Sequence, residues 1–134
     1  MVKIIKHIVR MYDTDAAGIL YFGSQFRFVH EAFESMIDEM GINFRTLVEN
    51  ESFMIVIAHA ESDYLQPVRV GDILEITSKI TRIGTTSFTI SYTLSFQDRT
   101  VCGKAQTVHV SIDKKTRNKI PLPEKLKPFL EQYK

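Results

Sequence analysis

One long helical pattern constrains the fold of this chain more than any other feature. Between positions 22 and 40, apolar residues recur at intervals of three and four, and Gly41 follows where helices commonly end. The apolar stripe consists of Phe22, Phe26, Val29, Phe33, Met36, Ile37 and Met40. A helix with one apolar side has to bury that side, so we expect the stripe to pack against the rest of the chain.

The remaining apolar patterns predict strands. One strand is expected at 3–11, before the helix, and four more at 53–66, 74–81, 88–96 and 101–112. Consecutive apolar residues from Met54 to Ile57 predict that the strand at 53–66 is buried on both faces. A short helix is expected after Pro123. These elements predict a single α+β domain over residues 1–134, in which an antiparallel sheet curves around one long helix.

Charge and cysteine content narrow the classes of partner and compartment. The 17 basic and 16 acidic residues give no reason to expect nucleic acid or a membrane surface as a partner, and the low net charge suits an oligomer. Cys102 is the single cysteine, so the chain cannot form an internal disulfide. The first residues lack the apolar core of a signal peptide, and we expect a cytoplasmic protein.

Common nucleophile and metal motifs are missing from the sequence. There is no G-x-S-x-G elbow, and Cys102 lies within a strand pattern, where a thiol is usually a small buried hydrophobic group. None of the four histidines has a partner at zinc-ligand spacing. We therefore expect no metal and no cofactor, and the carboxylates become the candidates for chemistry.

Two aspartates stand just before the long helix, in the segment D-T-D-A-A-G. In one interpretation Asp13 or Asp15 only caps the helix or shapes the turn. In the other, the small residues beside Asp15 let a ligand approach, and unpaired N–H groups near Tyr21 to Gly23 stabilise an oxyanion. A carboxylate facing such a site can attack a thioester carbonyl or activate a water for the attack.

The segment D-T-D-A-A-G-I-L-Y-F, followed by H-E-A-F-E in the helix, resembles the 4-hydroxybenzoyl-CoA thioesterase-like branch of the hotdog superfamily. The similarity includes the helix end E-M-G-I-N, the strand I-A-H-A-E-S-D-Y-L-Q-P, the turn V-G-D and the strand start T-S-F. Within that branch the chain is most similar to the 1,4-dihydroxy-2-naphthoyl-CoA hydrolase group. The resemblance implies a hotdog fold, in which the sheet wraps around the central helix.

The resemblance also implies an activity and a site. The expected reaction is hydrolysis of an acyl-CoA to the free acid and CoA, with 1,4-dihydroxy-2-naphthoyl-CoA of menaquinone or phylloquinone synthesis as the first candidate substrate. Asp15 matches the catalytic carboxylate of the family, as nucleophile or general base. The backbone N–H of Phe22 matches the oxyanion donor, and Gly18 and Tyr21 shape the approach to it. In this family the active site lies at a dimer interface, so a homodimer or homotetramer is expected.

Residues that contact the acyl group are less clearly marked. Phe26 belongs to the apolar stripe and is a candidate for the substrate pocket. His59 begins the polar half of its strand and is either a pocket residue or a hydrogen-bonded core histidine. Glu31 lies on the polar side of the helix pattern and is a candidate for an indirect role in the pocket.

The sequence departs from its relatives where CoA phosphates would bind. Some aromatic-CoA thioesterases carry a basic cluster just before the S-F strand, whereas this chain has Arg82 alone in that stretch. The candidates for phosphate binding are therefore Arg82, Arg69 and Lys104. The alternative is that all three are ordinary surface charges.

Other functions stay open at this stage. The substrate could instead be a short-chain or hydroxybenzoyl-type acyl-CoA. A hotdog acyl-CoA hydratase would need a histidine paired with an acidic residue at the helix, and usually an H-F-P-type loop that this sequence lacks. A non-catalytic acyl-CoA-binding module could use the same fold without turnover.

Overall fold

The computed structural model describes residues 1–42 and 44–134. Its elements, in chain order, are β1 (Lys3–Ile8), the 3-10 helix η1 (Met11–Asp13), α1 (Phe22–Glu39), α2 (Phe44–Asn50), β2 (Phe53–Tyr64), β3 (Ile73–Ile83), β4 (Ser87–Ser95), β5 (Val101–Asp113) and α3 (Lys127–Gln132). The expected helix end E-M-G-I-N includes Asn43, which lies outside the described residues. No helix among the described residues is both long enough and apolar enough to cross a membrane.

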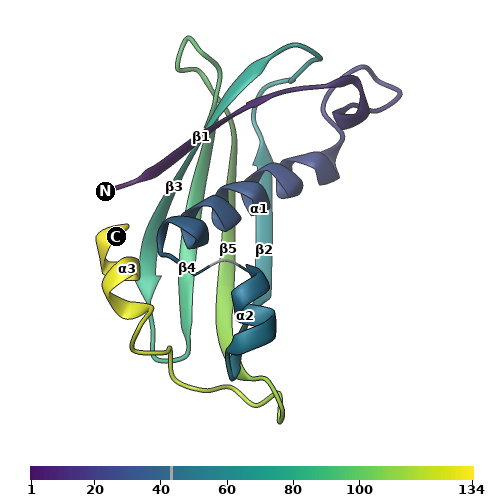
Figure 1. Cartoon of the computed structure of the whole chain (residues 1–134). Coiled ribbons are helices and arrows are strands. Elements are labelled where there is room, and N and C mark those ends of the chain that lie inside the picture. Colours follow the sequence, from purple (N-terminus) through teal and green to yellow (C-terminus); the bar gives the residue numbers. More distant parts are fainter. Residues whose placement is uncertain (43) are drawn as a thin grey trace.

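The strands form one five-stranded antiparallel sheet in the order β1-β3-β4-β5-β2. Helix α1 crosses one face of this sheet, and the C-terminal helix α3 lies near the end of β3 (Figure 1). The expected α+β fold, with one long helix on a curved antiparallel sheet, is therefore confirmed. Because strands β2 and β1 form the two edges, each has one side without a partner strand in this chain.

The largest differences from the sequence expectation are the end of the first strand and one unpredicted helix. The first strand ends at Ile8 rather than Met11, because the chain turns into η1 at Met11. Helix α2 was not predicted, since it has seven residues with Leu47 as its buried residue and is too short to show a helical period.

The apolar stripe of α1 is buried at its C-terminal end and not at its start. Phe33, Met36 and Ile37 are buried in the core, as the pattern predicted. At the N-terminal end the prediction is wrong, because Phe22 has 62% of its surface exposed while Gln25 is buried. The first turn of α1 therefore packs on the sheet through a polar side chain and presents an aromatic one to the outside.

Hydrogen bonds to the sheet explain why Gln25 is buried. Its Nε2 donates to Ser62 Oγ at 2.6 Å and to the Asp63 carbonyl at 3.0 Å. On β5, a methyl group added to Gly103 would lie 2.6 Å from Gln25 Oε1 and 2.9 Å from Nε2, both too close. The absence of a side chain at Gly103 therefore allows the start of α1 to approach the sheet.

Strand β2 is not buried on both faces, contrary to the expectation from its apolar run. Phe53 is buried, but exposure rises along the strand, and Ile57 has 46% of its surface exposed. The reason is its place at the sheet edge, where it pairs with β5 alone. A register shift between Ile57 and His59 also changes which side chains face α1 beyond that point.

We predict that Gly103→Ala destabilises the fold by roughly 1–3 kcal/mol, because the new methyl group forces Gln25 out of its hydrogen bonds. Urea denaturation of Gly103→Ala, Gln25→Ala and the double variant measures the effect. The cost of Gly103→Ala should fall by more than half when Gln25 is already alanine. Strictly additive costs would contradict the proposed contact.

Candidate active site

A buried carboxylate fixes the turn that precedes α1. Asp13 has none of its surface exposed, and its carboxylate accepts hydrogen bonds from the Arg10 backbone N–H at 2.8 Å and from the guanidinium of Arg27. His7 Nε2 lies 3.1 Å from the same carboxylate. Since Arg27 belongs to α1 and His7 to β1, this one group joins the turn to both a helix and a strand.

The backbone of Asp13 strengthens the same connection. Its carbonyl accepts hydrogen bonds from the Tyr21 N–H at 2.9 Å and from Ser24 Oγ at 3.0 Å. The two ends of the segment 13–21 are thereby held together at the start of α1.

The surroundings of Asp13 favour its charged form. Burial alone would raise the pKa of the carboxyl, but the hydrogen bonds from Arg10 and His7 and the positive charge of Arg27 outweigh burial. The pKa of Asp13 consequently lies below its ordinary value of 3.8. Asp13 is therefore charged at neutral pH, as the ion pair with Arg27 requires.

Asp15 lies in the turn held by Asp13, and its side chain is exposed. Asp15 Oδ1 accepts a hydrogen bond from the Ala17 N–H at 2.8 Å, and no partner of Oδ2 occurs among the described residues. Asp15 thus does shape the turn, as the local interpretation held, and still presents one carboxylate oxygen to a ligand. Gly18 closes the turn at φ +77°, and the space where its side chain would project is open.

The start of α1 supplies hydrogen-bond donors next to this turn. Helix α1 begins at Phe22, its N-cap Tyr21 makes no side-chain capping bond, and its first turn contains no acidic residue. The first N–H groups of a helix lack partners within it, and the helix dipole is positive at this end. The positive end is therefore neither capped nor neutralised by a neighbouring side chain of the helix itself, and it is available to a developing oxyanion.

Two contacts hold the helix start in place. The Leu20 N–H donates to the Val68 carbonyl at 2.8 Å, and the Tyr64 hydroxyl donates to the Phe22 carbonyl. Both partners come from β2 or the connection between β2 and β3. The turn, the helix start and the end of β2 therefore meet at one end of the sheet.

An apolar cavity of about 430 Å³ lies along α1, beginning one helical turn after Phe22. Phe26, Val29 and His30 of α1 form one wall, and Ile57 and Ala60 of β2 form another. Tyr92, Thr107 and His109 line it from the sheet. Four residues of helix rise about 6 Å, so the cavity starts close to the candidate oxyanion site.

The three predicted pocket residues lie in different places in the structure. Phe26 lines the cavity as expected, but His59 and Glu31 do not. The register shift in β2 puts Ala60 opposite Thr107, so His59 points away from α1 and lies 3.4 Å from Glu61. Glu31 lies 3.8 Å from His7 Nδ1, on the side of α1 that faces β1.

The three cations proposed for CoA phosphates are not brought together within the chain. Arg69 follows Val68, to which the helix start is bonded, so it lies at the Asp15 end of the sheet. Arg82 lies near the far end of β3, an 11-residue strand and thus about 30 Å away along the sheet.

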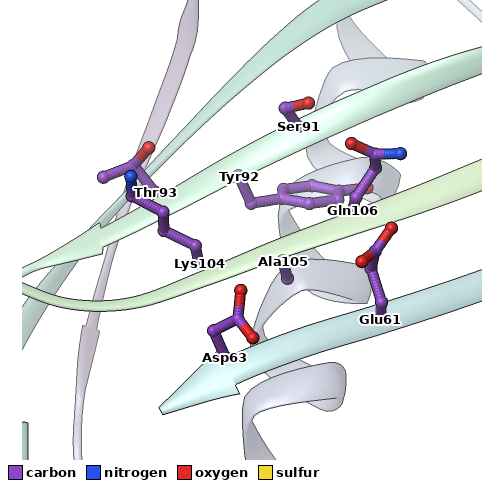
Figure 2. A pocket seen from close by; sticks show the side chains of 8 residues that line it. All are labelled: Glu61, Asp63, Ser91, Tyr92, Thr93, Lys104, Ala105 and Gln106. Carbon is purple, nitrogen blue, oxygen red and sulfur yellow. The ribbon is translucent and has the colours of Figure 1, made fainter. Parts of the chain in front are cut away.

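Lys104 faces away from α1. Its neighbour Gly103 faces Gln25 of the helix, and successive strand residues point to opposite faces. On the outer face Lys104 is paired across the strands with Asp63 and lines a polar depression that also contains Glu61 (Figure 2). The carboxylates of Asp63 and Glu61 line the same depression, so its charge does not favour a phosphate.

Several site residues were missed by sequence reasoning. The partners of Asp13 are six and 14 residues away and on different elements, so no local pattern links them. Along β5, polar Thr107 and His109 alternate with apolar Val108 and Val110. This alternation predicted that the apolar side chains face the core. The polar side chains instead face α1. Among the described residues, no group of three or more His, Cys, Asp or Glu side chains is arranged to hold a metal ion.

Several known proteins have sequences similar to this chain. A family model described as the thioesterase-like superfamily matches residues 9–130. A 1,4-dihydroxy-2-naphthoyl-CoA hydrolase from Synechococcus elongatus is 39% identical over 127 residues, which cover 94% of this chain and 93% of the relative. The hydrolase of the same name from Nostoc punctiforme is also 39% identical, over 92% of this chain and 82% of the relative.

A solved structure agrees with the sequence relatives. The crystal structure of a 1,4-dihydroxy-2-naphthoyl-CoA thioesterase from Synechocystis superposes with a TM-score of 0.91 at 28% identity. The match covers 97% of this chain and 96% of the other.

We predict that Asp13→Asn lowers the free energy of unfolding by roughly 1–3 kcal/mol at pH 7, because a neutral amide is a weaker acceptor than the buried carboxylate for the hydrogen bonds from the Arg10 N–H and Arg27. The folded-state pKa of Asp13 is lowered, so its contribution is present above the ordinary pKa and is lost as the pH falls through the folded value. Urea denaturation from pH 7 to 3 should therefore show the wild type and Asp13→Asn converging below about pH 4.

Asp38→Asn is the matched control, because Asp38 is an exposed carboxylate on the same helix. It should change stability little at any pH in this range. A difference between wild type and Asp13→Asn that stays constant down to pH 3 would contradict the assigned role of the charge.

Proposed function

We propose a thioesterase reaction for this chain, because the chain belongs to the thioesterase-like superfamily. The reaction is hydrolysis of an acyl-CoA to the free acid and CoA. The observation that carries the proposal is the exposed carboxylate of Asp15, in a turn fixed against the uncapped N-terminus of α1. A carboxylate and an oxyanion donor side by side are what thioester hydrolysis needs.

Asp15 has two possible routes to the same products. As a general base it takes a proton from water, whose oxygen then bonds to the thioester carbonyl carbon. As a nucleophile its own oxygen bonds to that carbon, and water later hydrolyses the resulting anhydride. In both routes the carbonyl oxygen becomes negative beside the Phe22 N–H, the C–S bond breaks, and the departing CoA thiolate takes up a proton. Label in Asp15 after a single turnover in ¹⁸O-water identifies the nucleophilic route, with water attacking the Asp15 carbonyl of the anhydride, because the general-base route puts the label in the product acid alone.

The cavity along α1 suits the acyl group. Its volume of about 430 Å³ falls within the range of small-molecule pockets, and Phe26, Val29 and Ile57 give it apolar walls. By kinship with the hydrolases from Synechococcus and Nostoc, we propose a 1,4-dihydroxy-2-naphthoyl group as its occupant. A hydroxybenzoyl-type group is the second candidate, because the same walls would accept a smaller ring.

A second copy of the chain is proposed to complete the site. In the single chain Asp15 is exposed, and Phe22 and Ile57 present apolar surface near the unpaired edge of β2. An exposed apolar strand edge of this kind is rarely left uncovered. Two-fold pairing of β2 with its copy would cover the edge and close the cavity.

Such a dimer would also change which cations can reach CoA. Antiparallel pairing of two β2 edges puts the far end of one sheet beside the Asp15 end of the other. Arg82 could then come from the second copy and act with Arg69 of the first. Lys104 is not included, because it points to the outer face.

The proposed mechanism uses this chain's own groups and needs neither a metal nor a cofactor. We also propose a cytoplasmic location, since the single cysteine suits a reducing compartment.

We predict that Asp15→Asn lowers kcat for acyl-CoA hydrolysis by at least about 10²-fold, because it removes the base or nucleophile. Thermal unfolding should change little, since the amide can still accept the Ala17 hydrogen bond. A panel of aromatic and short-chain acyl-CoAs, assayed for thiol release, provides the measurement. Asp38→Asn serves as the control, and full turnover by Asp15→Asn would exclude Asp15 from the chemistry.

We predict that Ile57→Asp yields a monomer at concentrations where the wild type is a dimer or larger, because a charge would be buried at the β2 edge. Sedimentation velocity measures the mass. Ile4→Asp is a matched control on the opposite edge strand, since Ile4 and Ile57 are 49% and 46% exposed. A monomeric wild type, or equal effects of the two substitutions, would contradict the β2 interface.

A further inference from the structure

Three buried polar side chains form a hydrogen-bonded chain on the helix-facing side of the sheet. The Tyr92 hydroxyl lies 3.0 Å from Thr107 Oγ1, and Thr107 Oγ1 lies 2.7 Å from His109 Nε2. All three residues have less than 5% of their surface exposed, and all three line the cavity along α1. The chain of polar groups is thus built into the sheet side of the pocket, whereas Arg27 and His30 line it from α1.

The imidazole of His109 is fixed and uncharged. Its ring stacks against Phe33 of α1, with 4.1 Å between the centroids, and against Phe88 of β4 at 5.0 Å. Burial, and secondarily the nearby His30, lowers the pKa of His109 to about 3. A neutral imidazole carries one N–H, so one ring nitrogen is a donor and the other an acceptor. Nδ1 is buried and has no hydrogen-bond partner among the described residues.

Counting protons shows that the chain always has an unused donor. If Tyr92 donates to Thr107 and Thr107 donates to His109 Nε2, the proton on Nδ1 has no acceptor. If His109 Nε2 donates to Thr107 and Thr107 donates to Tyr92, the phenolic proton has none. If Tyr92 and His109 Nε2 both donate to Thr107 Oγ1, the Thr107 hydroxyl proton has none. In every arrangement one buried hydrogen-bond donor of these three pocket-lining residues remains unpaired. A buried unpaired donor is unfavourable, so an acceptor on the ligand is strongly preferred there.

We propose that Tyr92, Thr107 and His109 select an acyl group whose aromatic ring carries a hydroxyl group. The inference rests on the proposed function and assigns a specificity determinant within that site. The ring lies between the apolar walls at Phe26, Val29 and Ile57, and its hydroxyl accepts the unused proton. A ring of the same shape without the hydroxyl leaves the donor unpaired and is rejected.

The test compares substrates that differ by hydroxyl groups alone. We expect the wild type to hydrolyse 1,4-dihydroxy-2-naphthoyl-CoA with a kcat/KM at least about tenfold higher than that for 2-naphthoyl-CoA. The 1-hydroxy and 4-hydroxy compounds show which hydroxyl is recognised. Ring hydroxyls also change the reactivity of the thioester, above all the 1-hydroxyl next to the carbonyl. The change in the ratio between the wild type and a pocket variant is therefore what reports on the pocket, because the substrates are the same in both measurements.

Three variants identify the donor. Tyr92→Phe removes one end of the chain and His109→Phe the other, and both keep an aromatic ring, while Thr107→Val removes the middle hydroxyl. We expect the variant that removes the working donor to bring the substrate ratio down to about threefold or less, mainly by slowing the hydroxylated substrate. An end residue that is not the donor can be replaced without loss of the ratio. A purely structural defect would slow both substrates alike.

Ser78→Ala is the matched control, since Ser78 is another buried hydroxyl, on β3, and does not line the cavity. It should leave the substrate ratio unchanged. If Tyr92→Phe, His109→Phe and Thr107→Val all retain the wild-type ratio, or if the wild type does not discriminate, the inference is wrong while the proposed function stands.

Loss of the proposed function gives a different result. If no acyl-CoA is hydrolysed, thioesterase activity is excluded, and calorimetric binding of 1,4-dihydroxy-2-naphthoate and 2-naphthoate decides the selectivity. The inference is supported if the wild type binds the hydroxylated acid more tightly and if this difference disappears in one of the variants that remove a donor. Equal binding of the two acids overturns it.

Discussion

The ion pair between Asp13 and Arg27 fixes the turn that carries Asp15, and the rest of the site depends on where that turn lies. Asp13 is fully buried and also contacts His7 of β1, so the turn is held against both a strand and the helix. Removing the charge of Asp13 is costly because a fully buried carboxylate loses its charge-assisted hydrogen bonds. The exposed carboxylate of Asp15 is thereby held at the start of α1 without itself being buried.

Different parts of helix α1 contribute to different parts of the site. Its uncapped start faces the turn and offers backbone N–H groups to an anion. Its middle lines the apolar cavity through Phe26 and Val29, and its last turns are packed into the core through Met36 and Ile37. Gln25 and Gly103 fix the position of the start on the sheet. One helix therefore holds the proposed oxyanion site and the proposed acyl pocket in a fixed relation to each other.

The sequence predicted the helices and strands better than it predicted which face of each is buried. Particular residues show why. The stripe from Phe33 to Ile37 has a helical period and is buried, because nothing local competes with packing. Phe22 and Gln25 reverse the pattern. The hydrogen bond from Gln25 to Ser62 and the absence of a side chain at Gly103 favour burial of the polar residue. His59 was misplaced by a register shift that alternation alone does not reveal. Asp15 came from a family resemblance, since local chemistry by itself also fitted a turn residue.

The most direct measurement is a crystal structure with an acyl-CoA analogue in which a methylene group replaces the thioester sulfur. The account predicts that the carbonyl oxygen lies within hydrogen-bond distance of the Phe22 N–H, with Asp15 beside the carbonyl carbon and the ring in the cavity along α1. A carbonyl bound away from both Asp15 and the helix start would contradict the account.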